Sequence, residues 1–424
     1  MRAAFILVLL AGCAPPGGER CGVDLHCGSD TIDVPHDDGS VDRVQVYAAR
    51  PIEGTALDVV VYAHGQGLGG VSNCAPDAST YSTPQARALA AEGFAAVAVH
   101  YRNSGEDVPG LGVLRARDHH LQDARAVLAA AHHVIELLGE DASGRVGLVG
   151  SSMGTWPSLW AVGADPRLTE LQSGLDLRTV VVHGETGNHL ANGSRRCEDA
   201  TSDHPEALTR YIMASVYAVL RSHTVLLGMS EVRREDLAAG QPLGDALRAS
   251  LTEQGVDALA AIFFEPPDPA IEGCASLVDR PAECGESCAF NTFRARFGEL
   301  PPPEDFVRPH VLETFCAFGP DTPDPGPDTG NPLTGALREL SPAYTLEGPT
   351  RVDRALSLLS EGDGHYNPTA QALLRERMAA LGVEMPEPAP NPGPDCGHGD
   401  YEDRSRRDCG IDLIVAELTE AFAE

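Results

Sequence analysis

The stretch GLVGSSMGTW, residues 147–156, places a serine between glycines at the point where an apolar run ends. Its first half continues a strand-like run and its second half begins a helix-like segment, so Gly150-Ser151-Ser152-Met153-Gly154 falls on the turn between them. Glycine at both ends allows a tight strand-to-helix turn that exposes the middle residue, Ser152. The helix start directs backbone N–H groups towards an anion formed there. The pattern predicts a nucleophilic Ser152, and the alternative is an ordinary tight turn.

Further apolar runs rich in valine alternate with helical patterns, which is typical of a mostly parallel sheet covered by helices on both faces. The strand candidates are residues 44–49, 58–64, 94–101, 145–150, 178–184 and 355–360. Helical patterns cover residues 118–139, 368–382 and the end of the chain. In the first of these, apolar residues repeat on one face and Gly139 gives a stop signal. The sequence predicts an α/β fold.

Residues 191–344 interrupt this alternation. They contain helical patterns followed by proline-rich loops, five of the cysteines and almost no strand signals. We therefore expect a mostly helical, disulfide-rich insertion that divides the core into residues 36–190 and 345–424. Parallel sheets build their sites at the carboxyl ends of their strands, so the insertion would lie over the site as a lid.

The N-terminal segment MRAAFILVLLAGCAPPGGER has the features of a secretory signal: Arg2, an apolar run too short to span a bilayer, and small residues before Cys13. Its Leu-Ala-Gly-Cys ending resembles the lipobox of bacterial lipoproteins. That resemblance implies removal of residues 1–12, acylation of Cys13 and a tether over residues 13–35. It predicts an exported protein, attached to the membrane through lipid only, in the periplasm or at the surface of a bacterium. A plain signal peptide is the alternative.

Cysteine usage agrees with export. Of 11 cysteines, Cys13 aside, an even number remain. An even number behind an export signal indicates disulfides formed in an oxidising compartment. The simplest pairings join Cys21 to Cys27 and Cys396 to Cys409, and the other pairings stay open.

The sequence argues against nucleic acids and metals as partners. The chain has 62 acidic residues against 31 basic ones, all of them arginine, and a formal net charge of −31. Such a surface repels phosphate backbones. Cys284 and Cys288 have a spacing that metal ligands can have, but no histidine stands nearby at ligand spacing, so we expect disulfides there instead.

A serine nucleophile needs a base, and the base needs a carboxylate that orients it. In a sheet of this kind both partners follow the serine, the acid before the histidine. Asp363 follows the last strand candidate, and His398 lies in a glycine-flanked loop before the final helix, so the pair has this order. Taken singly, Asp363 would be a turn residue and His398 a surface residue. His365 is an alternative base.

Residues 40–190 and 345–424 resemble the α/β-hydrolase superfamily of serine hydrolases. GSSMG matches its nucleophile motif, YAHGQG at residues 62–67 matches the segment that supplies an oxyanion-hole N–H, and the acid and the histidine have matching places. The resemblance implies an oxyanion hole formed by the backbone N–H groups of Gln66 and Met153. It implies a mechanism without metal or organic cofactor.

The same resemblance implies hydrolysis of a small acyl substrate through an acyl-enzyme, with carboxylic esters as the expected substrates. It extends to the catalytic domain of the prolyl-oligopeptidase family, so a serine peptidase or acylaminoacyl hydrolase is the alternative enzyme. The chain has no room for that family's propeller, which favours esters. A non-catalytic binding protein on a hydrolase scaffold is the alternative from another class. The acyl group, the leaving group and the oligomeric state stay open.

Overall fold

The structure is a computed structural model. It describes residues 19–21, 24–35, 39, 41–65, 83–100, 113–114, 119–188, 190, 216, 219–220, 222–224, 226–229, 231–266, 268–271, 285–298, 302–316, 332–348, 350–363, 366–386, 393–397, 401 and 404–423. The predicted signal segment and Cys13 lie outside the described residues.

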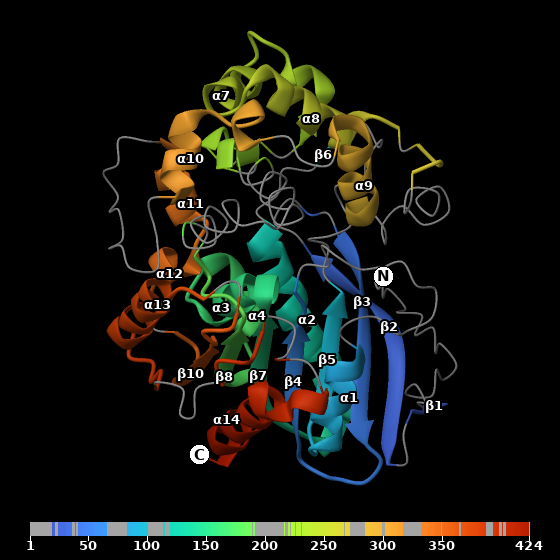
Figure 1. Cartoon of the computed structure of the whole chain (residues 1–424). Coiled ribbons are helices and arrows are strands. Elements are labelled where there is room, and N and C mark those ends of the chain that lie inside the picture. The colour runs from blue at the N-terminus through green and yellow to red at the C-terminus, as the bar shows by residue number, and fades with distance from the viewer. Residues whose placement is uncertain are drawn as a thin grey trace, which may run out of the picture.

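A central sheet has the strand order β1-β2-β3-β5-β4-β7-β8-β10 (Figure 1). The strands are β1 (Glu19–Arg20), β2 (Leu25–Pro35), β3 (Val41–Pro51), β4 (Leu57–Ala63), β5 (Ala95–His100), β7 (Ala142–Ser151), β8 (Asp176–His183) and β10 (Arg354–Leu358). From β5 to β10 all neighbours are parallel, whereas the pairs β1·β2, β2·β3 and β3·β5 are antiparallel. Every predicted strand is present in this sheet, and the predicted α/β class is confirmed.

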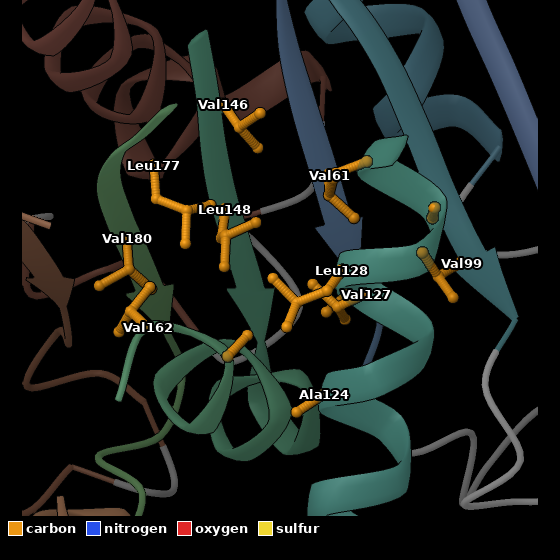
Figure 2. Packing of buried hydrophobic residues seen from close by; sticks show 14 of the residues in the cluster. Val61, Val99, Ala124, Val127, Leu128, Val146, Leu148, Val162, Leu177 and Val180 are labelled. Carbon is orange, nitrogen blue, oxygen red and sulfur yellow. The ribbon is translucent and has the colours of Figure 1, made fainter. Parts of the chain in front are cut away.

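Helices cover both faces of the sheet. On one face, α2 (His119–Leu138), α3 (Thr155–Val162) and α13 (Pro368–Ala380) share a buried cluster with the strands. Figure 2 shows Leu128 of α2 packed near Leu148 of β7 in this cluster. On the other face, α1 (Thr83–Ala91) and α14 (Ile411–Ala423) pack around strand residues such as Val60 and Val149. None of the described helices is long and apolar enough to cross a membrane.

The sheet begins earlier in the chain than the sequence analysis places it. Residues 25–35, assigned there to the tether, form β2 and pair with β3 along their full length. The second half of β2 buries only alternate residues, Ile32 and Val34, so it lacks the continuous apolar run that marks the central strands. Cys21 is bonded to Cys27 at its start, which confirms one predicted pairing.

The segment between β8 and β10, which we call the cap, contains helices gathered beyond one end of the sheet (Figure 1). The described helices gathered there include α7 (Pro242–Ser250), α8 (Glu253–Phe264), α9 (Gly285–Phe297), α10 (Pro309–Cys316) and α11 (Pro332–Glu339), whereas α12 (Pro342–Thr345) lies against α13 of the core. They enclose a separate hydrophobic cluster in which Leu247, Leu259 and Phe306 are fully buried. A short strand of the cap, β9 (Val232–Arg233), pairs with β6 (Val113–Leu114) of the core.

The two connections between cap and core meet at one place. The Ala343 N–H donates to the Gly187 carbonyl at 3.3 Å, and the Asn188 side-chain amide donates to the Tyr344 hydroxyl at 3.0 Å. The Arg338 guanidinium lies over the Tyr344 ring, 4.3 Å from its centroid. The two ends of the cap therefore lie side by side where they join the core.

Candidate active site

Ser152 occupies the turn between β7 and α3. β7 ends at Ser151, a 3-10 turn spans Ser152–Gly154, and α3 begins at Thr155. The φ of Ser152 is +48°, and Ala56 is the only other described residue besides glycines with a positive value. This left-handed conformation costs a non-glycine residue about 1 to 3 kcal/mol, and such strain concentrates at functional sites. The predicted strand-turn-helix context of Ser152 is confirmed.

The two glycines of GSSMG are required by close backbone approaches. A Cβ on Gly150 would stand 2.5 Å from the Gly154 carbonyl oxygen. A Cβ on Gly154 would stand 2.0 Å from the Ala63 carbonyl oxygen, at the end of β4. Both distances are far below van der Waals contact, so neither position accepts a side chain. The glycines thus let the turn fold back on β7 and lie against β4, which imposes the strained conformation of Ser152.

The segment that follows β4 lies directly against this serine. A Cβ on Gly65 would stand 2.9 Å from Ser152 Cβ and 3.5 Å from Ser152 Oγ. His64 is buried, and its Nδ1 donates to the Gly65 carbonyl at 2.6 Å. Burial lowers the pKa of His64, against a smaller opposite effect of that hydrogen bond, so the ring is neutral at pH 7. Gln66 lies outside the described residues, and Met153 directly follows Ser152.

Asp363 lies beyond the end of β10, at the same edge of the sheet as Ser152. Ser151 of β7 pairs with His183 of β8, and His183 pairs with Leu358 of β10, so these three strands end in register. Asp363 is fully buried, and its N–H donates to the Ser360 carbonyl at 3.0 Å. A carboxylate is kept in such a place only where hydrogen bonds or charges stabilise it.

The two candidate bases, His365 and His398, lie outside the described residues. The chain before His398 is described as far as Gly397 and resumes at Tyr401, which is fully buried.

The segment leading to His398 runs against the Asp363 turn. A Cβ on Gly362 would stand 2.2 Å from the Pro394 carbonyl oxygen, so the two backbones touch. Cys396 is bonded to Cys409, as predicted, which ties this segment to the start of α14. Packing and a covalent bond together hold the approach to His398 beside the turn that ends in Asp363.

Sequence reasoning missed several buried polar residues at this edge of the sheet, among them His183, Glu185 and Tyr401. The centroids of the His183 and Tyr401 rings are 5.4 Å apart. Glu185, only 4% exposed, comes two residues after β8 ends. The letters HGETG, residues 183–187, at the end of the predicted strand 178–184 are a signal for the first two, because polar residues at the carboxyl ends of parallel strands line sites. Tyr401 has no comparable signal in the sequence.

The described part of the site holds a strained serine, a buried histidine in the segment that lies against this serine, and a buried aspartate at the same sheet edge. Within the described residues, no three His, Cys, Asp or Glu side chains are grouped to hold a metal ion.

A mostly parallel sheet, helices on both faces and a serine strained at the end of a middle strand define the α/β-hydrolase fold. Among solved structures, the chain is similar to the rice cell wall degrading esterase LipA from Xanthomonas oryzae, at 14% identity over 94% of this chain and 89% of that one, with a TM-score of 0.53. It is also similar to Candida antarctica lipase A in its closed state, at 10% identity over 85% of this chain and 71% of that one, with a TM-score of 0.51. At these identities the likeness establishes the shared fold. No family model and no curated protein matches the sequence.

Proposed function

We propose that this protein is a serine hydrolase that cleaves carboxylic esters through an acyl-enzyme. The observation that carries the proposal is the positive φ of Ser152 at the end of a central parallel strand, held there by backbone approaches that only glycine permits. A hydroxyl presented this way precedes a helix whose first N–H groups face the reacting atoms. Two of the proteins with a similar fold are an esterase and a lipase, which supports ester substrates.

In the proposed reaction, His398 takes the proton of Ser152 as the serine oxygen attacks the acyl carbon, and Asp363 holds the imidazole in the required tautomer. The N–H groups of Gln66 and Met153 stabilise the oxyanion, and losing one such donor costs about 2.7 to 4 kcal/mol. The imidazolium then protonates the departing alkoxide as its bond to the acyl carbon breaks. Water, deprotonated by the same imidazole, releases the acid and restores the serine.

The buried position of Asp363 supports its role as the acid. The carboxyl group lies at the sheet edge that Ser152 occupies, and the segment before His398 packs on the turn that holds it. A carboxylate protected from water interacts more strongly with an imidazolium than an exposed one does.

We also propose that the protein is exported and attached to a membrane through lipid on Cys13. The disulfides Cys21–Cys27 and Cys396–Cys409 support an oxidising compartment, and Cys316 is disulfide-bonded as well. Stable attachment takes more than one acyl chain, because a single chain binds membranes only marginally.

A fluorophosphonate probe tests the enzyme proposal. It should label the wild-type protein and fail to label Ser152→Ala, because only an activated serine attacks the phosphorus. Ser151→Ala is the matched control: the neighbouring serine is lost, and labelling should persist. Labelling that survives Ser152→Ala would move the nucleophile elsewhere, and a wild-type protein that neither reacts nor turns over any ester would favour a binding protein.

Two substrate panels test the reaction class. We expect p-nitrophenyl esters to be hydrolysed with a kcat/KM at least about a hundredfold above that of matched peptide anilides, a difference of roughly 2.7 kcal/mol in transition-state stabilisation. A preference for the anilides would support the peptidase alternative.

A further inference from the structure

Ser360 hydrogen-bonds to two segments that are distant in sequence. We call residues 360–363 the acid turn and residues 393–401 the base loop. The Ser360 hydroxyl donates to the Gly393 carbonyl at 2.7 Å, and its backbone N–H donates to the Tyr401 hydroxyl at 2.6 Å. Its carbonyl accepts the bond from the Asp363 N–H at 3.0 Å. Ser360 thus bonds to both ends of the base loop and to the acid of the proposed triad.

Tyr401 is itself rigidly held. It is fully buried, and its ring lies against His183 at the end of β8. A Cβ on Gly410 would stand 2.3 Å from the Tyr401 carbonyl oxygen, so the start of α14 packs on its backbone. The hydroxyl that accepts the Ser360 bond is therefore fixed by the sheet on one side and by the last helix on the other.

Further contacts hold the acid turn and the base loop, one of them between the two segments and the others within the acid turn or from Arg406. The Gly362 N–H donates to the Ser360 hydroxyl at 3.1 Å, while the Gly362 Cα touches the Pro394 carbonyl. The Arg406 guanidinium donates to the Asp395 carbonyl at 2.8 Å, which supports the base loop from its outer side. These contacts leave little freedom for one segment to slide past the other.

The 2.6 Å hydrogen bond between Ser360 and Tyr401 joins residues that are close in sequence to the proposed acid and base. Ser360 stands three residues before Asp363, and Tyr401 stands three residues after His398. This hydrogen bond therefore joins the acid turn, which carries Asp363, to the end of the base loop, which carries His398.

We propose that Tyr401 is a positioning residue. Its hydroxyl fixes the segment that carries the His398 imidazole against the segment that carries the Asp363 carboxylate. The proposal rests on the proposed function, because it concerns the same triad. A misplaced base loses orders of magnitude in rate, and a carboxylate that contacts an imidazole raises its pKa. Loss of the hydrogen bond between Ser360 and Tyr401 should therefore change both the reaction rate and the pH at which the base titrates.

Tyr401→Phe tests this directly, because it keeps the ring against His183 and removes only the hydroxyl. We expect kcat on p-nitrophenyl butyrate to fall by between about tenfold and a hundredfold, with KM within about twofold of wild type. The acidic limb of the kcat/KM profile should move to lower pH, because the imidazole loses part of its contact with the carboxylate.

Tyr47→Phe is the matched control. The Tyr47 hydroxyl also accepts a hydrogen bond, from Arg87 Nε at 2.7 Å, but it lies on β3, away from the triad strands. This variant should lower the melting temperature and leave kcat and the pH profile unchanged.

Ser360→Ala gives a second, independent arm, because it removes the hydroxyl bonds to Gly393 and Gly362 and keeps the backbone N–H. It should lower kcat and shift the pH limb in the same direction as Tyr401→Phe. If the wild type turns over esters while both variants match it in kcat and pH profile, the positioning role is refuted and the proposed function stands. If the wild type has no turnover and no fluorophosphonate labelling, the proposed function fails and this role fails with it.

Discussion

Gly154 shows how little room the Ser152 turn has. The backbone passes the end of β4 so closely that a Cβ would overlap the Ala63 carbonyl, which is itself fixed in the sheet. Neither group is the mobile tip of a side chain, so a substitution must displace the turn and Ser152 with it. The strain at Ser152 is therefore maintained by the contact at Gly154.

Gly154→Ala should destabilise the protein by about 1 to 3 kcal/mol, as overpacking does, and should abolish ester turnover. Gly335→Ala, in α11, is the control: nothing lies within 4 Å of its Cβ position, and alanine favours a helix over glycine by about 0.5 to 1 kcal/mol. Urea unfolding and turnover on one ester measure both effects. A Gly154→Ala protein with wild-type stability and activity would show that the turn tolerates a side chain.

A second prediction at the level of single residues concerns which histidine is the base. We expect His398→Ala to reduce turnover about as deeply as Ser152→Ala, with the double variant little worse, because members of one triad act as a unit. His365→Ala should keep most of the activity. A folded, inactive His365→Ala beside an active His398→Ala would move the base into the Asp363 loop.

Among the elements, the cap has a buried histidine that makes its stability depend on pH. His223 is 7% exposed, and its Nε2 lies 2.9 Å from the Ser250 hydroxyl at the end of α7. Burial lowers the pKa of His223 to about 4, so the ring is neutral in the folded cap. The unfolded chain binds a proton at this ring near pH 6.5, and the folded chain does not.

Stability should therefore be complete above about pH 6.5 and fall as the pH drops towards 4, by up to about 3 kcal/mol from this group. Urea unfolding at pH 7.5, 6 and 5 measures it. His223→Gln should be less stable at pH 7.5 but lose less on acidification than the wild type. Equal slopes for the two proteins would remove His223 as the cause.

The cap should control which substrates enter and supply no catalytic group, because it contains no member of the proposed triad. Its two connections meet at Gly187 and Ala343, so a short linker can replace residues 191–341 without stretching the core. The shortened protein should keep turnover on a small acetate ester and lose selectivity among longer acyl chains. If it folds, as circular dichroism would show, yet has no acetate turnover, the cap contributes to the chemistry.

The strands and helices of the core could be predicted because each is a continuous apolar run or a one-sided apolar repeat between turn residues. β2 could not, because a strand exposed on one face and rich in polar residues has no such run. The positions of Ser152 and Asp363 at one edge of the sheet follow from motif and chain order. The position of Tyr401 does not, because the sequence does not show that the folded chain brings this residue to the same edge.

At the scale of the whole molecule, the proposed lipid on Cys13 would attach the folded domain to the membrane through the N-terminal segment. The sheet starts at β1, residues 19–20, close behind Cys13 in sequence. Few residues would then separate the lipid from the folded domain, and the enzyme would work close to the membrane surface.

A variant in which a plain signal peptide with its own cleavage site replaces residues 1–13 should lack the lipid, leave the membrane fraction and keep the ester turnover of the wild type. Intact-mass spectrometry of the wild type should find the chain beginning at Cys13 with the mass of its acyl chains. An unmodified Cys13, or cleavage elsewhere, would contradict the anchor.

The meeting of the chain at Gly187 and Ala343 also bears on how such a protein can change over generations. A segment that departs and returns at one point can be gained, lost or exchanged by a single recombination event, because the flanking strands keep their spacing whatever lies between them. The residues of the proposed triad lie outside that segment. Exchange of the cap would therefore change which substrates enter and leave the proposed catalytic residues as they are.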